Sequence, residues 1–329
     1  MSEPSITVIG AGVAGLVTAL ELAERGARVE ILERSATLGA DACSRLAGGM
    51  LAPWCEGENA EPAVTELGQQ ALRYWPRVHA PTCQRGTLVV APPRDTVELA
   101  RFAARCSDHR RLDEDDIAAL EPDLAGRFRH ALFFAREAHL DPRAALLSLQ
   151  ARLQALGVAL HFGTDGQAAG GRVIDCRGLA ARDRLADLRG VRGEMLLLHC
   201  RDLAISRPVR LLHPRFPLYI VPRGAGVFMI GATMLESAAR GRASARSVVE
   251  LLNAAYALHP AFAEAEIMEI GCDARPAFAD NMPRLHHDGA RLHVNGLYRH
   301  GFLLSPALAR LAADHMLGAA PPYTSANGA

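Results

Sequence analysis

The sequence predicts a mixed α/β fold, because three kinds of pattern follow one another along the chain. A strand–turn–helix–strand pattern fills residues 6–32, and strand patterns crowd residues 194–233. A last strand, turn and helix follow over residues 292–316. This order indicates a discontinuous α/β domain (α+β overall for the whole chain) that carries an inserted β-rich domain.

The N-terminal unit begins with the apolar, β-branched run 6–9, which is typical of a buried parallel strand. It leads into the turn Gly10-Ala11-Gly12-Val13-Ala14-Gly15. A helical pattern follows as far as Gly26, and residues 27–32 form a second strand pattern that ends at Glu33. These features together predict a Rossmann-type βαβ unit that binds a dinucleotide.

Each residue of this unit has a physical role. Gly10 permits the tight turn, Gly12 lets the backbone approach a pyrophosphate, and Gly15 lets helix and strand pack closely. The helix N-terminus offers free N–H groups to the phosphates. Glu33 is placed to accept hydrogen bonds from the ribose hydroxyls, and it would repel a 2′-phosphate, so we interpret Arg34 as incidental. The unit alone does not choose between NAD and FAD.

Hydrophobic periodicity predicts the remaining elements. Asp141 is expected to cap a helix with Pro142 at its first position. Helices are expected over residues 61–79, 95–106, 113–120, 141–156, 246–258 and 305–316. Strands are expected over residues 87–91, 131–134, 158–162, 172–175, 195–199, 209–212, 218–221, 227–230, 267–272 and 292–295. The small-residue loop 43–54 suits the close approach of a flat ligand.

Composition excludes several classes of function. The 329 residues carry 36 basic and 36 acidic groups, and this zero net charge gives no reason to expect nucleic acid or an anionic membrane as a partner. No uncharged apolar run reaches the ~20 residues that span a bilayer, so a soluble, cytoplasmic protein is expected. The seven cysteines lack C-x-x-C spacing and are expected to be free thiols. No metal-ligand cluster is present in the sequence, and residues 319–329 are expected to be a flexible tail.

Further motifs follow the glycine-rich turn in a fixed order. They are Gly48-Gly49-Met50-Leu51-Ala52-Pro53, His139-Leu140-Asp141-Pro142-Arg143, Val191-Arg192-Gly193-Glu194, Tyr219-Ile220-Val221-Pro222-Arg223, Gly231-Ala232-Thr233-Met234, Arg275-Pro276 and Gly296-Leu297-Tyr298-Arg299-His300-Gly301-Phe302-Leu303-Leu304-Ser305-Pro306. Together they resemble the D-amino-acid oxidase family of FAD-dependent oxidoreductases, and within it they are most similar to the glycine oxidases of thiamine biosynthesis. The sequence departs from the family at His300, where asparagine is common, and at the turn Cys176-Arg177-Gly178.

The resemblance implies an FAD enzyme that deaminates glycine or another small amine or amino acid. A hydride would pass from the substrate α-carbon to flavin N5, oxygen would accept the electrons as H2O2, and the imine would give glyoxylate and ammonia. Arg275 is expected to hold the substrate carboxylate with two parallel hydrogen bonds. Tyr219 would assist it, and Arg299 would lie near the flavin. Homo-oligomerisation is left open.

The resemblance also implies a set of cofactor-binding residues. They are Gly10, Gly12, Val13, Ala14, Gly15, Glu33, Arg34, Ser44, Arg45, Ala47, Gly48, Gly49, Met50, Val173, Gly178, Arg275, Arg299, His300, Gly301, Phe302 and Leu303. The FAD-binding domain is expected to comprise residues 1–80, 141–190 and 271–318, and the substrate-binding domain residues 81–140 and 191–270.

Other functions remain open at this stage. One is a D-amino-acid oxidase or dehydrogenase for larger substrates, and another is a flavoprotein that oxidises a partner protein. A flavin hydroxylase is disfavoured because Asn295-Gly296 stands where a G-D pair is usual. A non-catalytic FAD-binding module is disfavoured because a carboxylate anchor is present. Cys43 and Cys272 are the positions considered for covalent FAD, although free thiols are favoured.

Overall fold

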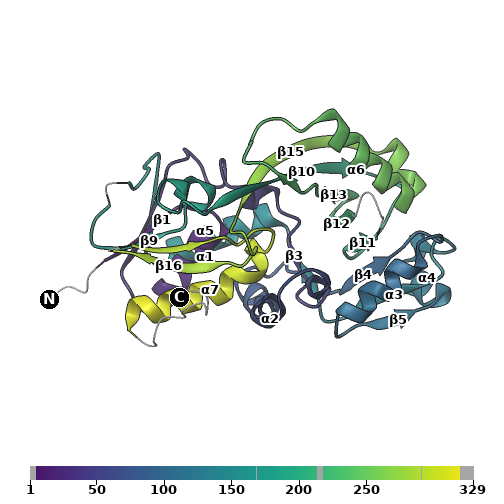
Figure 1. The fold of residues 1–329 in the computed structure, drawn as a ribbon, viewed down its shortest axis with the longest axis horizontal. Coiled ribbons are helices and arrows are strands. Elements are labelled where there is room, and N and C mark those ends of the chain that lie inside the picture. The colour runs from purple at the N-terminus through teal and green to yellow at the C-terminus, as the bar shows by residue number, and fades with distance from the viewer. Residues whose placement is uncertain (1–4, 168, 213–217, 290, 319–329) are drawn as a thin grey trace.

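The computed structural model describes residues 5–167, 169–212, 218–289 and 291–318. Most of the strands belong to two β-sheets, which lie at opposite ends of the molecule (Figure 1). The tail expected at residues 319–329 lies outside the described residues. Within them, no helix has both the length and the apolar composition needed to cross a membrane.

The first sheet is built from three separate stretches of the chain. Its order is β16 (Arg284–Asp288), β17 (Arg291–Asn295), β9 (Arg172–Asp175), β1 (Ile6–Ile9), β2 (Val29–Glu33) and β8 (Ala159–Phe162). The pairs β17–β9, β9–β1, β1–β2 and β2–β8 are parallel, and only β16 is antiparallel to its neighbour. The parallel order confirms the Rossmann-type unit at the N-terminus.

Helices pack around one another beside this sheet. They are α1 (Val13–Glu24), α2 (Pro62–Val78), α5 (Pro142–Ala155) and α7 (Gly301–Leu317), and α1 and α2 both pack on α7. The carboxylate of Asp141 accepts hydrogen bonds from the backbone N–H groups of Arg143 at 2.8 Å and Ala144 at 3.1 Å, which confirms the expected cap of α5.

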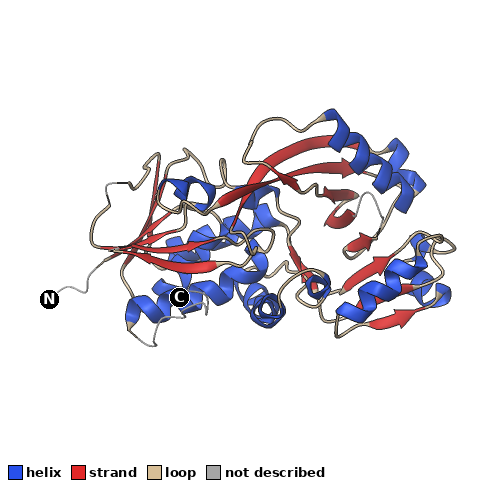
Figure 2. Ribbon diagram, in the orientation of Figure 1, coloured by secondary structure: helices blue, strands red, loops and turns tan. Residues whose placement is uncertain are grey.

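The second sheet has nine strands among the described residues and is the β-rich part of the molecule (Figure 2). Its main path is β14 (Leu235–Glu236), β10 (Arg189–His199), β13 (Val227–Gly231), β12 (Leu218–Gly224), β11 (Val209–Leu211), β4 (Thr87–Val90), β6 (Ala131–Phe134) and β5 (Arg110–Leu112), and β15 (Glu266–Ala277) pairs with β10. Helix α6 (Ala245–Leu258) packs on β10, β12 and β13, while α3 (Thr96–Arg105) and α4 (Glu114–Leu120) lie near β5 and β6. The short strands β3 (Met50–Leu51) and β7 (Ala138–His139) pair with each other.

The last helix begins four residues earlier than the sequence pattern indicates. Pro306 was expected near the start of a helix over residues 305–316, yet α7 begins at Gly301. A proline lacks an N–H, so the carbonyl of Phe302 one turn earlier loses its usual partner. The indole Nε1 of the buried Trp75 donates to this carbonyl at 2.7 Å. The hydrogen bond from α2 thus satisfies the group that Pro306 leaves free.

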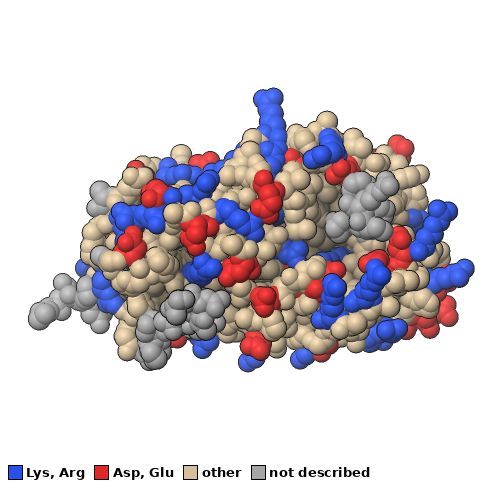
Figure 3. Space-filling model, in the orientation of Figure 1, with Lys and Arg blue, Asp and Glu red and all other residues tan. Residues whose placement is uncertain are grey.

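The other differences concern extended segments. Strands β10 and β15 are longer than expected because they pair along almost their whole length. Strand β16 was not expected, since His286 and His287 are polar and exposed at the edge of the first sheet. On the face drawn in Figure 3, basic and acidic side chains are interspersed. All seven cysteines are described and none forms a disulfide, as expected.

Candidate functional site

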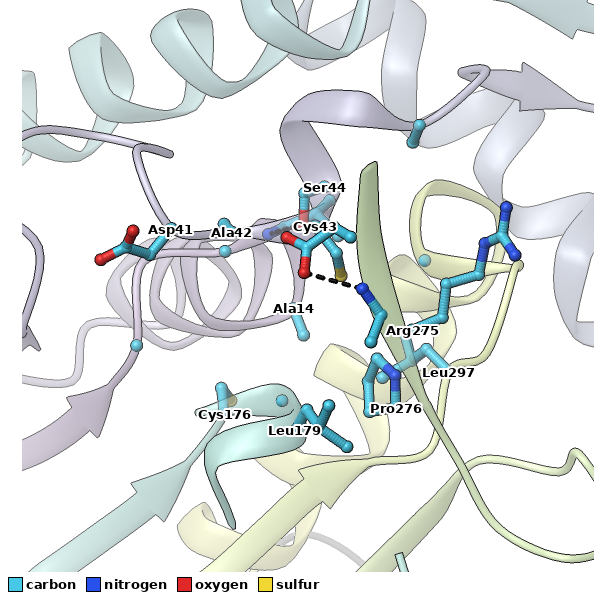
Figure 4. A pocket seen from close by; sticks show the side chains of 18 of the residues that line it. Ala14, Asp41, Ala42, Cys43, Ser44, Cys176, Leu179, Arg275, Pro276 and Leu297 are labelled. Atoms are coloured by element: carbon cyan, nitrogen blue, oxygen red, sulfur yellow. Dashed lines mark hydrogen bonds between the residues drawn. The ribbon is translucent and has the colours of Figure 1, made fainter. Parts of the chain in front are cut away.

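A cavity opens between the Rossmann-type unit and the β-rich part. Much of its wall comes from the glycine-rich turn, the loop around the 3₁₀ turn η1 (Cys43–Leu46), the 3₁₀ turn η4 (Gly178–Asp183), strand β15 and the start of α7. Figure 4 shows Asp41 and Arg275 at opposite ends of this cavity, with Cys43 and Ser44 between them.

The glycine-rich turn leaves open space where a phosphate needs it. Gly10 has φ of 100°, and a Cβ there would lie 2.8 Å from the carbonyl oxygen of Cys176. A Cβ on Gly15 would overlap the carbonyl oxygen of Gly10, which explains the close packing of turn and helix. A Cβ on Gly12 would meet only Ser44 Oγ at 3.5 Å and Ala42 Cβ at 3.8 Å. The backbone at Gly12 lines the cavity and has room beside it, so it fits the close approach of a pyrophosphate.

Glu33 ends β2 beside this turn. Its Oε2 accepts a hydrogen bond from the N–H of Ala11 at 2.6 Å, and its Oε1 accepts one from the N–H of Ser35 at 2.8 Å. Each carboxylate oxygen has a further lone pair, so Glu33 can hold the turn and still accept from a ribose hydroxyl. Arg34 and Asp165 line the same end of the cavity. This end has the donor and acceptor groups that the nucleoside half of FAD requires.

A buried arginine holds the loop that follows η1. Arg223 donates to the carbonyl oxygens of Leu140 at 3.0 Å, Ala47 at 3.2 Å and Gly48 at 2.9 Å. Burial lowers the pKa of Arg223 to about 10, so the group is still charged at neutral pH. Gly48 faces the ring of Tyr219, where a Cβ would lie 2.7 Å from the ring carbon Cε2. Arg223 and Gly48 thereby fix how closely this loop approaches Tyr219.

Arg275 supplies a cation to the far end of the cavity. Its guanidinium lies against Gly193 of the neighbouring strand β10, and its Nη1 donates to the carbonyl oxygen of Thr233 at 3.2 Å. Among the described residues it forms no ion pair with a carboxylate. Tyr219, Gly193 and Ala232 line the cavity around it. A guanidinium in this setting can take a carboxylate from a ligand.

Arg299 has a different environment. Its Nη2 donates to Oε2 of Glu56 at 2.5 Å, and the Nε2 of His300 lies 2.9 Å from the same oxygen. Burial opposes ionisation of Glu56, but the charge of Arg299 and the hydrogen bond with His300 outweigh it and hold the pKa of Glu56 well below its usual range. Arg299 is therefore committed to a protein carboxylate, whereas Arg275 is not.

The structure brings most of the expected site residues to the cavity. Those in its lining are Gly10, Gly12, Val13, Ala14, Glu33, Arg34, Ser44, Ala47, Gly48, Gly178, Tyr219, Arg275, Arg299, Gly301 and Phe302. Seven others do not line it: Gly15, Arg45, Gly49, Met50, Val173, His300 and Leu303. Gly15, Gly49 and Val173 instead support the walls by close packing or strand pairing, since a Cβ on Gly49 would overlap the carbonyl oxygen of Leu140 and Val173 pairs with Thr7.

Sequence reasoning missed several residues of the lining. Arg177 was noted only as part of a turn that departs from the family pattern, yet it lines the cavity. Its Nη2 forms ion pairs with Oδ2 of Asp175 at 2.8 Å and with Oδ1 of Asp183 at 2.9 Å. Arg240 and Asp273 also line the cavity, and nothing in their local sequence indicated this.

Comparisons with known proteins agree with this geometry. The family model described as FAD-dependent oxidoreductase (DAO) matches residues 5–315. The chain is 56% identical over 319 residues to a putative thiamine biosynthesis oxidoreductase ThiO of Rhizobium etli, covering 95% of this chain and 96% of that protein. It is 28% identical over 358 residues to a glycine oxidase of Pseudomonas putida, covering 96% of this chain and 95% of that protein. A crystal structure of glycine oxidase from Bacillus cereus shares the fold, with a TM-score of 0.85 and 21% sequence identity. The match covers 97% of this chain and 96% of that protein. The chain therefore belongs to the DAO family of FAD-dependent oxidoreductases.

Proposed function

We propose that this enzyme oxidatively deaminates glycine, or another small amino acid or amine, in the thiazole branch of thiamine biosynthesis. The names of its relatives, a thiamine biosynthesis oxidoreductase and a glycine oxidase, support this substrate class. The proposal keeps the expected division of the chain, in which residues 1–80, 141–190 and 271–318 bind FAD and residues 81–140 and 191–270 bind the substrate, except that Arg275 of the first part also reaches the substrate.

The observation that carries the proposal is the guanidinium of Arg275. It lines the cavity and has no carboxylate partner among the described residues, although 36 acidic residues are available in the chain. A substrate carboxylate can satisfy it with two parallel hydrogen bonds. Tyr219, which lies in the same part of the lining, can add a hydroxyl donor. These two side chains would fix one end of a small amino acid and so orient its α-carbon.

FAD would be held by the glycine-rich turn, Glu33 and the loop that contains Ser44. When bound, it supplies the acceptor for a hydride from the substrate α-carbon, and oxygen then takes up the electrons as hydrogen peroxide. The residues of the chain contribute position and charge, and holding the reactants in contact removes much of the barrier. The imine released from glycine would react with water to give glyoxylate and ammonia. This balances one glycine, one oxygen and one water against one glyoxylate, one ammonia and one peroxide.

The test replaces Arg275 and follows turnover with glycine. Arg275→Ala should keep FAD but lower kcat/KM by roughly 10²- to 10³-fold, since a charged, bidentate contact is worth about 3–4 kcal/mol in a site sheltered from water. Arg275→Lys should recover part of this loss because it restores the charge without the fork geometry. The control is Arg246→Ala, whose side chain is 71% exposed. Full activity of Arg275→Ala would contradict the anchor.

The substrate panel separates the alternatives. D-alanine and sarcosine compared with glycine test for a D-amino-acid oxidase or a broader amine oxidase. A protein that holds FAD but oxidises none of the three would favour a larger substrate or a residue of a partner protein.

A further inference from the structure

The side chain of Arg240 joins two walls of the cofactor cavity. Arg240 lies in the segment between β14 and α6, residues 237–244, which we name the strap. Its Nε donates to Asp273 Oδ1 at 2.5 Å, and its Nη2 donates to Asp273 Oδ2 at 3.0 Å. The same Nη2 donates to the backbone carbonyl oxygen of Asp41 at 2.5 Å. Asp273 belongs to β15, while Asp41 lies two residues before η1 on the opposite wall, and both line the cavity.

The strap is itself anchored to the β-rich part. Arg192 of β10 donates to the carbonyl oxygen of Arg242 at 2.5 Å and to that of Ala239 at 3.5 Å. The N–H of Ser244 donates to Glu194 Oε1 at 3.0 Å. The backbone that presents Arg240 is therefore fixed on both sides of it. The hydrogen bond from Arg240 to Asp41 thus connects the loop of the Rossmann-type unit to a strap that is itself held in place on β10.

A second hollow lies on the other side of this tie. Its lining includes the start of α6, the outer part of β15 and the exposed residues Arg45 and Arg242. It shares five lining residues with the cofactor cavity: Asp41, Ala42, Leu46, Arg240 and Asp273. Arg240 therefore stands at the boundary between the cavity and the hollow. Removal of its side chain would break the direct tie between Asp41 and Asp273 and open the boundary between the two spaces.

We propose that Arg240 is a latch that slows the release of FAD. The inference rests on the FAD site proposed above, in which residues 41–48 form one wall and β15 the other. A long, flat cofactor leaves such a cavity when the walls separate. The Arg240 contacts resist that separation with charge-assisted hydrogen bonds, which are stronger than neutral ones. The side chain remains 37% exposed, so the latch can open without moving a buried charge.

The test measures FAD release from the holoenzyme after dilution, by the rise in fluorescence of free flavin. Arg240→Ala should release FAD about tenfold faster, which corresponds to ~1.4 kcal/mol. Arg242→Ala is the matched control, because it removes an exposed arginine from the same strap whose side chain forms no ion pair within the described residues. It should release FAD at the wild-type rate. Asp273→Asn, which keeps the shape but weakens the tie, should give an intermediate rate.

The proposed role of Arg240 is contradicted if Arg240→Ala releases FAD within twofold of the wild-type rate. It is also contradicted if Arg242→Ala accelerates the release as much as Arg240→Ala does. Because the readout is cofactor release and not turnover, the result does not depend on which substrate the enzyme oxidises. Failure of the glycine assay with an intact difference in release would contradict the proposed function and leave the latch in place.

Discussion

Gly193 of β10 makes room for the guanidinium of Arg275 of β15: a Cβ at position 193 would overlap Nη2 and Cζ of the arginine. The two strands are antiparallel neighbours, with Gly193 paired to Asp273 and Val191 to Arg275, so the arginine reaches diagonally across the ladder. The glycine of the Arg192-Gly193-Glu194 motif is thus explained by a side chain 82 positions later in the sequence.

Gly193→Ala should displace Arg275 and weaken substrate binding. We expect kcat/KM for glycine to fall by roughly 10- to 100-fold, equivalent to about 1.4–2.8 kcal/mol, mostly through KM. The FAD content should be unchanged. Steady-state kinetics on the purified variant measure this. Gly170→Ala is the matched control, since a Cβ there meets nothing within 4 Å and the backbone is unstrained. Normal kinetics for Gly193→Ala would show that Arg275 does not need this position.

Substitution of two glycines of the N-terminal turn should lower different properties, FAD binding in one case and stability in the other. Gly12→Ala places a methyl in the cavity with only ordinary contacts, so the apoprotein should fold but bind FAD at least about tenfold more weakly. Gly15→Ala drives its Cβ into the carbonyl of Gly10, so it should lower the melting temperature even without FAD. Flavin titration and thermal unfolding of the apoproteins separate the two effects. Equal loss of apoprotein stability in both variants would contradict the assignment of Gly12 to the pyrophosphate.

Glu56→Gln should disturb both Arg299 and His300, because one carboxylate oxygen serves both. Loss of a largely buried ion pair should cost on the order of 2 kcal/mol of unfolding free energy and should also lower kcat. Glu58→Gln is the comparison, since Glu58 pairs with Arg210 at 2.7 Å and does not touch Arg299. It should lower stability but leave kcat nearly unchanged. A matching fall of kcat in both variants would assign Glu56 a purely structural role.

Glu137 should make stability decline as pH rises. The side chain is fully buried, and burial raises its pKa to about 8 from about 4.5. Between these values the folded protein binds the extra proton, so unfolding becomes easier as pH increases through that window. Glu137→Gln keeps the acceptor for the N–H of Cys55 and should raise the unfolding free energy at pH 8 by about 1–3 kcal/mol, with little effect near pH 4.5. Denaturant unfolding at both pH values measures this, with the exposed Glu264→Gln as control. An equal effect at the two pH values would contradict the buried, protonated state.

Local patterns were enough to predict the parts of the fold that are encoded locally. The spacing of Gly10, Gly12 and Gly15 between two β-branched runs predicted the Rossmann-type unit, and Asp141 before Pro142 predicted the start of α5. Strand β16 was missed because an edge strand with exposed polar residues lacks an apolar face. The start of α7 was misplaced because a hydrogen bond from Trp75, 227 positions away from Phe302, compensates for Pro306.

The site divides in the same way. Residues within contiguous motifs, such as Gly48 and Gly301, were predicted and lie in the cavity. The long-range hydrogen bonds and ion pairs that position such residues were not predicted. Glu56 and Arg299 are 243 positions apart, and Asp41 and Arg240 are 199 apart. Such pairs are determined by how segments far apart in the sequence pack together in the fold, and a single sequence contains no local signal for that.

The most direct test of the central claim is the reduction of the bound flavin by glycine without oxygen. The purified enzyme should show the visible absorption bands of FAD, and anaerobic glycine should bleach them, faster than D-alanine of the same concentration. Arg275→Ala should show the same bands and resist bleaching. A flavin that glycine, sarcosine and D-alanine all fail to reduce would contradict the proposed reaction.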